Sequence, residues 1–333
     1  MTVTDTATRA ELEQAYLTMH RIRAFEAKAM ELFAEKYIRG SVHPYTGQEA
    51  IAVGVCGVLE DGDYITSTHR GHGHCIAKGL ELRRMMAEIT GRATGYCRGR
   101  GGSMHITAMA HGMLGADAIV AGSLAMAVGA AYCLRLQGGN CVVVAFFGDG
   151  GAQQGLFHEA ANLAAILDAP VVFVCENNQW AISTPISCAI RIDNIADRAA
   201  GYGFPGEVVD GNDLFAVREA ATRAVGRARS GAGPTLIEAK TYRITPHSAA
   251  TPQDTRDPDE LAHWREQDPI ARVGRHLLEN DVTPARLEEL EGQAREEVED
   301  AAQWALESPY PDPSDAEEDV YAPADWLRPG RLA

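Results

Sequence analysis

Two polar segments, each placed directly after a predicted buried strand, have residue types that can do chemistry. Asp149, held between glycines, follows the apolar run 141–147, and Asn177 and Asn178 close the next run, 170–175. Carboxylate, amide and backbone carbonyl oxygens are hard donors suited to Mg²⁺ or Ca²⁺, with phosphate oxygens and water completing an octahedron. Because the carboxyl ends of parallel strands meet at one edge of a sheet, these side chains can converge on one ligand.

The glycine-rich segment fits the common nucleotide-binding loops less well. A dinucleotide-binding loop needs GxGxxG, and in GDGGAQQG the glycine that would have to be the third of the motif, Gly155, falls two positions too late. The phosphate-binding motif GxxxxGK[ST] occurs nowhere in the chain. A lone GDG is more commonly a plain strand-to-helix turn, but such a turn does not account for a second strand that ends in two asparagines. A helix starting nearby would add backbone donors for a phosphate group.

A second polar cluster, HRGHGH, holds His69, Arg70, His72 and His74. Its three histidines raise the possibility of a zinc site, but neither a cysteine nor an acid completes a plausible tetrahedron of ligands. The glycines make the backbone approachable, and an arginine guanidinium can clamp a phosphate with two hydrogen bonds. We therefore interpret this segment as a phosphate contact.

The elements that must position these residues follow from hydrophobic periodicity. Apolar residues recur at helical spacing from Ala10 to Tyr37, which predicts a long amphipathic helix at the start of the chain. In the middle of the chain, β-branched runs alternate with helical segments, as in a parallel sheet that is buried on both faces. The further predicted helices cover 82–90, 123–136, 154–166, 214–229, 258–278 and 284–307, the strands 141–147, 170–175 and 235–242, and the loops 40–47, 69–74 and 245–258.

The bulk composition limits the class of protein. The chain has 333 residues, of which 46% are hydrophobic and 23% charged, so it can fill a large core. A formal net charge of −16 with no basic tract argues against a nucleic-acid-binding surface. No apolar run approaches the ~20 residues that span a bilayer, and the first residues do not resemble a signal peptide. Seven cysteines without a CxxC pair suit a reducing compartment, so we expect a soluble, cytoplasmic protein.

Several motifs, in order along nearly the whole chain, resemble those of one enzyme family. They are YTGQEA, HRGHGH, GRGGSMHI, GMLGADAIV, GDGGAQQG, CENNQWAIST and TYRITPHS. The spacing from GDG to NN resembles the thiamine-diphosphate motif, and the surrounding sequence resembles the α subunit of two-component E1 enzymes of 2-oxo acid dehydrogenase complexes. The resemblance implies the thiamine-diphosphate-binding fold, an α/β fold in which helices flank a mostly parallel sheet.

The resemblance and the predicted elements together suggest a domain plan. We expect a single thiamine-diphosphate-binding domain over residues 1–333. It would consist of an N-terminal helical arm (1–40), an α/β core (41–245), an active-site loop (246–258) and C-terminal helices with an acidic tail (259–333). The tail is rich in proline and acid, which is typical of a solvated terminus.

The family pattern assigns the metal and the diphosphate to particular residues of this sequence. It implies that the Asp149 and Asn178 side chains and the Trp180 carbonyl bind Mg²⁺. It also implies that Gly150 and Gly151 donate backbone hydrogen bonds to the diphosphate.

The same pattern assigns further contacts to thiamine diphosphate. Arg70 matches the arginine that contacts its phosphates, and His69, which replaces the tyrosine usual at the preceding position, is expected to bind the cofactor as well. Ala118 and Val120, in GADAIV, match positions whose backbone lines the aminopyrimidine ring. The resemblance likewise implies that Arg243, in TYRITPHS, belongs to the cofactor-binding residues.

One histidine stands out as a catalytic candidate in the family pattern. His247 matches an active-site histidine on a loop at the channel mouth, where it would contact the cofactor and handle protons or oxyanions near neutral pH. The neighbouring Ser248 matches a position that is phosphorylated in some relatives. Pro246 and Thr251 replace a glycine and an aspartate that are common in the family.

The resemblance implies oxidative decarboxylation of a 2-oxo acid, either pyruvate or a branched-chain acid, with transfer of the acyl group to lipoamide. In this family a glutamate that activates the cofactor belongs to a separate β subunit, so we expect activity only in an α2β2 heterotetramer that docks on a lipoyl-bearing E2 acyltransferase. Two alternatives stay open. The same residues could cleave acetoin, or the chain could be a structural paralogue without cofactor, against which the intact Asp149 and Asn178 argue.

Overall fold

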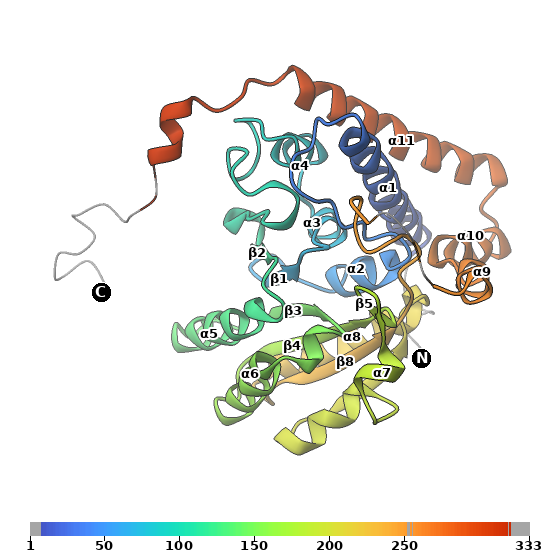
Figure 1. Cartoon of the computed structure of the whole chain (residues 1–333). Helices are drawn as coiled ribbons and strands as arrows, with labels where there is room; N and C mark the ends of the chain where they lie inside the picture. The colour runs from blue at the N-terminus through green and yellow to red at the C-terminus, as the bar shows by residue number, and fades with distance from the viewer. Residues whose placement is uncertain (1–7, 252–253, 255, 319, 321–333) are drawn as a thin grey trace.

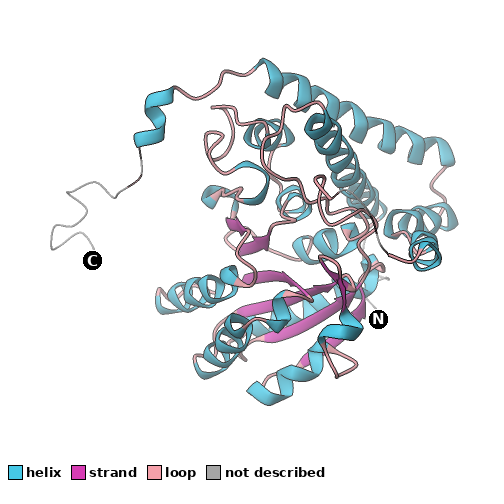
Figure 2. Ribbon diagram, viewed as in Figure 1, coloured by secondary structure: helices cyan, strands magenta, loops and turns pink. Residues whose placement is uncertain are grey.

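A parallel sheet lies at the centre of the molecule. The computed structural model describes residues 8–251, 254, 256–318 and 320. Six strands form the sheet in the order β2-β1-β3-β4-β8-β7, and every neighbouring pair is parallel. Helices cover both faces (Figure 2). The predicted α/β class, with a parallel sheet between helices, is therefore confirmed.

The strands are short and the helices vary widely in length. The sheet contains β1 (Tyr64–Thr68), β2 (Met113–Asp117), β3 (Val143–Gly148), β4 (Val171–Asn177), β7 (Gly206–Asp210) and β8 (Thr235–Lys240), and an antiparallel hairpin contains β5 (Trp180–Ala181) and β6 (Thr184–Pro185). The helices are α1 (Arg9–Ala34), α2 (Glu49–Cys56), α3 (His72–Ala77), α4 (Leu82–Ile89), α5 (Gly122–Leu136), α6 (Gly155–Ile166), α7 (Ile186–Ala189), α8 (Leu214–Arg229), α9 (Pro258–Glu266), α10 (Pro269–Glu279) and α11 (Pro284–Glu307).

Alternation along the central strands explains why the sheet is buried on both faces. Successive side chains of a strand point to opposite faces. On β3, Phe146 belongs to the core shared with α1, α2 and α8, whereas Phe147 belongs to the core shared with α5 and α6. The same alternation places Glu176 and Asn177, at the end of β4, on opposite faces of the sheet.

The strand order creates the crevice in which open parallel sheets bind ligands. The chain runs outward from β1 to β2, returns to β3 on the other side of β1, and continues outward through β4. The direction of winding therefore reverses between β1 and β3. His69 and Arg70 directly follow β1, and Asp149 directly follows β3. The topology thus brings the predicted phosphate and metal segments to the same crevice.

Some elements differ from the predictions. The predicted loop 69–74 contains the start of α3, at His72. The predicted helix 258–278 is two helices, because Pro269 cannot donate to the preceding turn and instead takes the first position of α10, which Asp268 caps. The sequence patterns do not predict β1, β2, β7 or α2, all of which have eight residues or fewer.

The N-terminal and C-terminal helices form a layer outside the sheet and its flanking helices. α1 packs along α11 and also contacts α3 and α10 (Figure 1). It begins with a capping box, in which Thr8 and Glu11 exchange hydrogen bonds between side chain and backbone. The predicted helix from Ala10 to Tyr37 is thereby confirmed, although it begins at Arg9 and ends at Ala34.

Parts of the predicted segments lie outside the described residues. These parts are 1–7 of the helical arm, 252–253 and 255 of the active-site loop, and 319 and 321–333 of the acidic tail. Of the helices that the structure describes, none combines the length and the apolar character that crossing a membrane requires.

Candidate functional site

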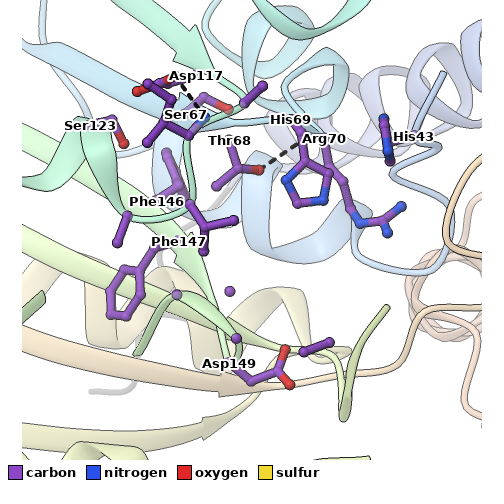
Figure 3. A pocket seen from close by; sticks show the side chains of 18 of the residues that line it. His43, Ser67, Thr68, His69, Arg70, Asp117, Ser123, Phe146, Phe147 and Asp149 are labelled. Carbon is purple, nitrogen blue, oxygen red and sulfur yellow. Dashed lines mark hydrogen bonds between the residues drawn. The ribbon is translucent and has the colours of Figure 1, made fainter. Parts of the chain in front are cut away.

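A cavity of about 420 Å³ opens at the carboxyl ends of β1, β2, β3 and β4 (Figure 3). This volume suits a small molecule or cofactor. Its wall contains every site residue predicted from the sequence except Arg243, namely His69, Arg70, Ala118, Val120, Asp149, Gly150, Gly151, Asn178, Trp180 and His247. The fold therefore gathers residues that are up to 178 positions apart, His69 and His247, around one space.

Asp149 lies in the wall directly after β3, and its side chain is buried. Burial raises the pKa of Asp149 to about 6, although hydrogen bonds from its own and the Gly150 backbone and the charges of Arg243 and Arg70 act in the opposite direction. The existing positive charges therefore do not compensate for the loss of water around the carboxylate. A buried carboxylate that lacks sufficient positive charge is suited to binding a cation.

Asn178 is held with its amide nitrogen engaged. Its Nδ2 group donates to Gln48 Oε1 at 3.2 Å, and its Oδ1 atom accepts a long hydrogen bond of 3.3 Å from the Trp180 backbone. The amide oxygen is therefore the atom that can bind a metal ion. Asn177 does not join it, because strand alternation turns Asn177 to the other face, where it donates to Glu238 Oε1 at 2.7 Å. Of the two asparagines expected to converge on a ligand, only Asn178 lines the cavity.

The β5–β6 hairpin carries the Trp180 carbonyl. Gln179, with φ of +71°, has a left-handed conformation between Asn178 and Trp180, which lets both neighbours line the same cavity. Such a conformation costs a non-glycine residue on the order of 1–3 kcal/mol and is common at functional sites. Arg243 lies behind the hairpin, where its Nη1 and Nη2 groups donate to the carbonyl oxygens of Trp180 and Ile182 at 3.0 and 2.7 Å. The structure places Arg243 as a support of the hairpin, outside the cavity wall.

Of the two glycines after Asp149, only Gly150 lies so close to a neighbouring segment that a side chain would not fit. A Cβ atom on Gly150 would lie 2.9 Å from the Cβ atom of Ala181, so the hairpin packs directly against the backbone at Gly150. A Cβ atom on Gly151 would lie 3.6 Å from Phe147, an ordinary contact. The second glycine of GDG therefore brings the hairpin with Trp180 against the loop that carries Asp149.

Arg70 and His247 are joined on the opposite side of the cavity. The buried Arg70 guanidinium donates to the Pro44 carbonyl at 2.8 Å, to the His247 carbonyl at 2.9 Å and to His247 Nδ1 at 3.0 Å. Because a guanidinium can only donate, Nδ1 accepts, and a neutral His247 carries its proton on Nε2. Burial and the charge of Arg243 lower the pKa of Arg70 to about 9, so it is positively charged at neutral pH.

Three imidazoles surround Arg70. The His43 ring centroid lies 4.9 Å from that of His69 and 4.9 Å from that of His247, and Figure 3 shows His43, His69 and Arg70 together across the cavity from Asp149. Burial, followed by the charge of Arg70, lowers the pKa of all three histidines, to about 3 for His43 and about 4 for His247. In the chain alone His247 is thus neutral at pH 7, whereas the family pattern had suggested a histidine that handles protons near neutral pH.

The wall formed by the loop after β2 is apolar and open. Ile119 is 69% exposed and Val120 is 47% exposed, although both line the cavity. The loop is ordered by a hydrogen bond of 2.9 Å from the Ile119 backbone to Asp117 Oδ1. It leads into α5 through Ala121, whose left-handed φ of +66° is again unusual for a residue other than glycine. The chain alone therefore does not close this side of the cavity.

The other two histidines of HRGHGH do not line the cavity. His72 and His74 point into the interior, where each lies 3.0 Å from a carboxylate, of Glu26 and Glu176 respectively. The acids were not apparent near HRGHGH in the sequence because they come from α1 and β4. The phosphate interpretation therefore concerns His69 and Arg70 alone. Within the described residues, no three His, Cys, Asp or Glu side chains form a group that could hold a metal ion.

The sequence of the chain is similar to known proteins over most of its length. It matches the family described as dehydrogenase E1 component over residues 17–314. The chain belongs to this family. It is 50% identical over 307 residues to the α subunit of acetoin:2,6-dichlorophenolindophenol oxidoreductase of Bacillus subtilis, which covers 92% of each chain. The protein of the same name from Cupriavidus necator is 43% identical over 308 residues, also 92% of each chain. The pyruvate dehydrogenase E1 component subunit α of Porphyra purpurea is 39% identical over 323 residues, 95% of this chain and 94% of the relative.

Membership of the E1 family confirms the identification made from the motifs. The relatives that match over more than nine tenths of the chain are named as α subunits, and the chain is an oxidoreductase subunit of the E1 α type. E1 dehydrogenases depend in general on thiamine diphosphate, and an E1 α chain implies a β subunit as partner.

Sequence reasoning did not assign three residues at the site. Gln48 orients Asn178, and His74 lies behind the strand ends. His43 belongs to the cavity wall itself, where its ring contacts that of His69. Gln48 is part of the motif YTGQEA, and a buried Gln within a motif is a usable sign of a role at a site. Nothing in the local sequence around His43 indicates its neighbours.

Proposed function

We propose that this E1 chain binds thiamine diphosphate and Mg²⁺ in the cavity and, with a β subunit, oxidatively decarboxylates a 2-oxo acid, with transfer of the acyl group to lipoamide. The observation that carries the proposal is the buried Asp149 at the reversal point of the sheet, beside Asn178 and Trp180 in one wall. Thiamine diphosphate, when bound, supplies the electron sink for cleavage of a carbon–carbon bond next to a carbonyl group.

The donors around Asp149 fit a magnesium ion. The proposed ligands are the Asp149 carboxylate, the Asn178 amide oxygen and the Trp180 carbonyl, all hard oxygens. Three protein ligands leave room in an octahedron for diphosphate oxygens and water. A divalent ion would also supply the positive charge that the buried Asp149 lacks, as its raised pKa indicates.

The remaining predicted contacts divide between the two sides of the cavity. Near the metal, the Gly150 and Gly151 backbone N–H groups would donate to the diphosphate. Across the cavity, the Arg70 guanidinium and His69 would contact the phosphates, and on the open wall the Ala118 and Val120 backbones would contact the aminopyrimidine ring. Arg243, whose two hydrogen bonds fix the hairpin, would act on the cofactor through the Trp180 carbonyl.

His247 is the proposed catalytic residue of this chain. Arg70 holds its Nδ1 atom, so the Nε2 atom is the one available to donate or accept a proton. The anionic diphosphate in the cavity would raise the pKa of His247 from its low value of about 4 towards neutrality, where an acid–base residue works best.

The proposed assembly follows from the open wall. Exposed apolar side chains at Ile119 and Val120 leave the cavity incomplete, and we propose that the β subunit covers them in an α2β2 heterotetramer. The β subunit would also supply the group that activates the cofactor. Transfer of the acyl group requires docking to a lipoyl-bearing E2 acyltransferase.

Two further expectations belong with this proposal. We propose that residues 1–333 act as one thiamine-diphosphate-binding domain, with the sheet as its centre. We also propose a reducing, cytoplasmic setting, which is supported by the fact that all seven cysteines are free and three of them are buried.

A second candidate function is cleavage of acetoin. It is favoured by the 50% and 43% identity to two subunits named for acetoin oxidation. Both reactions cleave a carbon–carbon bond next to a carbonyl group and would use the same cavity. They differ in the fragment that leaves, which is carbon dioxide from a 2-oxo acid and acetaldehyde from acetoin.

Turnover assays with the cognate β subunit test the proposal and separate the two substrates. Pyruvate, branched-chain 2-oxo acids and acetoin would be supplied with an artificial electron acceptor, and carbon dioxide and acetaldehyde would be measured. Carbon dioxide release from a 2-oxo acid supports the first function, and acetaldehyde release from acetoin supports the second. Calorimetry with thiamine diphosphate and Mg²⁺ is the control, because a complex that binds neither would be a structural paralogue and would overturn both.

A further inference from the structure

A buried imidazole connects the ends of the three central strands. The Ser67 hydroxyl of β1 lies 2.7 Å from His74 Nδ1, and Glu176 Oε1 of β4 lies 3.0 Å from His74 Nε2. The imidazole ring stacks on Phe146 of β3, with centroids 3.8 Å apart. All four of these residues are buried, with at most 3% of their surface exposed. One side chain, carried by α3, thus contacts β1, β3 and β4 at once.

The direction of each hydrogen bond follows from Tyr45. Its hydroxyl donates to Glu176 Oε1, so the carboxylate acts as an acceptor and also accepts from His74 Nε2–H. The Nδ1 atom is then left to accept the Ser67 hydroxyl proton. Gly73 makes this arrangement possible, because a Cβ atom there would lie 2.2 Å from Tyr45 Cδ1. Both imidazole nitrogens and the hydroxyl groups of Ser67 and Tyr45 therefore have partners, and the Tyr45 oxygen also lies 3.2 Å from His74 Nε2, which makes the network rigid.

The contacts of His74 are close in the chain to the residues proposed to hold the cofactor. Ser67 lies two residues before His69, Phe146 three before Asp149, and Glu176 two before Asn178. At β4 the link is direct, since the Asn178 backbone N–H donates to the Glu176 carbonyl at 2.9 Å. A displacement of His74 would therefore shift the strand ends that carry the proposed metal and phosphate contacts.

A second network of the same chemical groups has a different position. Ser103 Oγ lies 3.0 Å from His72 Nε2, and His72 Nδ1 lies 3.0 Å from Glu26 Oε2. All three side chains belong to buried residues. This network joins the turn Gly102–Met104 and α3 to α1, instead of joining strand ends to each other. The molecule thus contains a matched pair of Ser–His–Glu networks. One of them reaches the cavity, because Ser67 lines its wall while His74 and Glu176 lie behind it.

We infer that His74 is a positioning residue that fixes the ends of β1, β3 and β4 relative to one another and thereby sets the Mg²⁺-dependent affinity for thiamine diphosphate. The inference rests on the proposed function. Ligands carried by separate strands must be held to within about 0.5 Å of their working geometry. Two directed hydrogen bonds on one imidazole fix the separation of β1 and β4, which an apolar ring of the same size does not do. Substitution of a group that hydrogen-bonds to a metal ligand typically lowers metal affinity by about 10–100-fold.

The test compares the two serines. Ser67→Ala and Ser103→Ala each remove one hydroxyl group from a buried Ser–His–Glu network. Calorimetric titration of the full-length chain with its β subunit would measure binding of thiamine diphosphate over a series of Mg²⁺ concentrations, with thermal unfolding measured in parallel. Ser67→Ala is expected to weaken Mg²⁺-dependent binding about tenfold, whereas Ser103→Ala should leave the affinity within about twofold of the wild type. Both variants should lower the unfolding midpoint by about the same amount. Ser67→Thr, which keeps a hydroxyl, is expected to restore the affinity.

A second variant tests the imidazole itself. His74→Phe keeps a ring that can stack on Phe146 but removes both hydrogen bonds, and it is expected to weaken binding by about 10–100-fold. If that variant does not fold, Glu176→Gln and its counterpart Glu26→Gln decide the question, because neither glutamate lines the cavity and each change keeps the size of the side chain. Equal affinities for wild type and Ser67→Ala, or equal losses in the two serine variants, would overturn the inference and leave the proposed function intact. A wild-type complex that binds no thiamine diphosphate would overturn the proposed function first, and this inference with it.

Discussion

The two ends of the cavity differ in how completely this chain builds them. At the metal end, Asp149 is 5% exposed and Asn178 is 6% exposed, and Gln48 and the hairpin hold them in place. At the opposite end, Ile119 and Val120 are 69% and 47% exposed and nothing in the described chain covers them. One end has the burial of a protein core, and the other has the exposure of a protein surface.

This difference indicates a division of labour between the subunits. In the proposed site, the chain alone would provide the complete position for a metal ion and a diphosphate, but only one wall for the ring system of the cofactor. Apolar side chains that line a cavity and are also exposed are typical of a surface that a partner covers. We call the buried end with Asp149 and Asn178 the closed end, and the exposed end with Ile119 and Val120 the open end. Substitutions at the closed end should therefore change cofactor binding, and substitutions at the open end should change assembly of the two subunits.

The largest effect is expected at the closed end, from Asp149→Asn. Loss of the carboxylate removes the only charged ligand proposed for Mg²⁺, so calorimetry on the complex should show cofactor affinity reduced by at least about 100-fold. The exposed Asp197→Asn is the matched control and should bind normally. Unchanged Mg²⁺-dependent binding in Asp149→Asn would show that the metal lies elsewhere.

The same variant should not destabilise the chain. Burial raises the folded-state pKa of Asp149 to about 6, above its unfolded value. The stability that this group contributes is therefore present below the unfolded pKa and lost as the pH rises through 6, so at pH 7 the charged carboxylate costs roughly 2–3 kcal/mol without its metal. Asp149→Asn should unfold at the same or a higher temperature than the metal-free wild type, and a clear decrease would contradict the carboxylate's role.

A smaller effect on binding but a large effect on turnover is expected from His247→Ala. The proposed acid–base role of the Nε2 atom predicts that kcat falls by about 10²–10⁴-fold. Cofactor affinity should stay within about threefold, because the metal end is unchanged. His263→Ala, at an exposed histidine on α9, is the control. Equal turnover in His247→Ala and wild type would remove the catalytic assignment.

The residues of the closed end could be predicted from the sequence because they follow neighbouring parallel strands, whose ends lie at the same edge of the sheet. Asp149 and Asn178 each follow a continuous apolar run, and the ends of consecutive parallel strands share an edge of the sheet. Alternation with period two also decides which of the two asparagines faces the ligand, but it needs the end of β4 to be known to one residue. That boundary is the detail that sequence patterns define least well.

The networks behind the site could not be predicted in the same way. His74 bonds to Glu176 across 102 positions, and Asn178 bonds to Gln48 across 130. A polar residue in a motif shows that a contact is needed, but only packing decides which distant partner meets it. The direction of the three histidines in HRGHGH therefore became clear only from the short helix α3, which turns His72 and His74 away from the cavity.

An intermediate effect is expected at the open end, from Ile119→Asp. A charge on this exposed apolar wall should weaken association with the β subunit by at least about tenfold, measured by sedimentation or titration of one subunit with the other. Leu278→Asp changes a 43% exposed leucine on α10 and should leave association unchanged. Normal assembly of Ile119→Asp would mean that the partner covers a different surface, and the contrast between the two ends would then have another cause.

The smallest effect concerns the pH dependence of metal binding at the closed end. With a pKa of about 6 in the metal-free chain, Asp149 must lose a proton before it binds Mg²⁺ at lower pH. Affinity should be constant above pH 7 and fall by about fourfold at pH 5.5, approaching tenfold per further pH unit. Calorimetry in two buffers with different heats of ionisation should detect uptake of the released proton by the buffer at pH 5.5 and almost none at pH 8. A pH-independent affinity would mean that the carboxylate is already ionised before the metal arrives, and hence that burial is not what prepares this end for a cation.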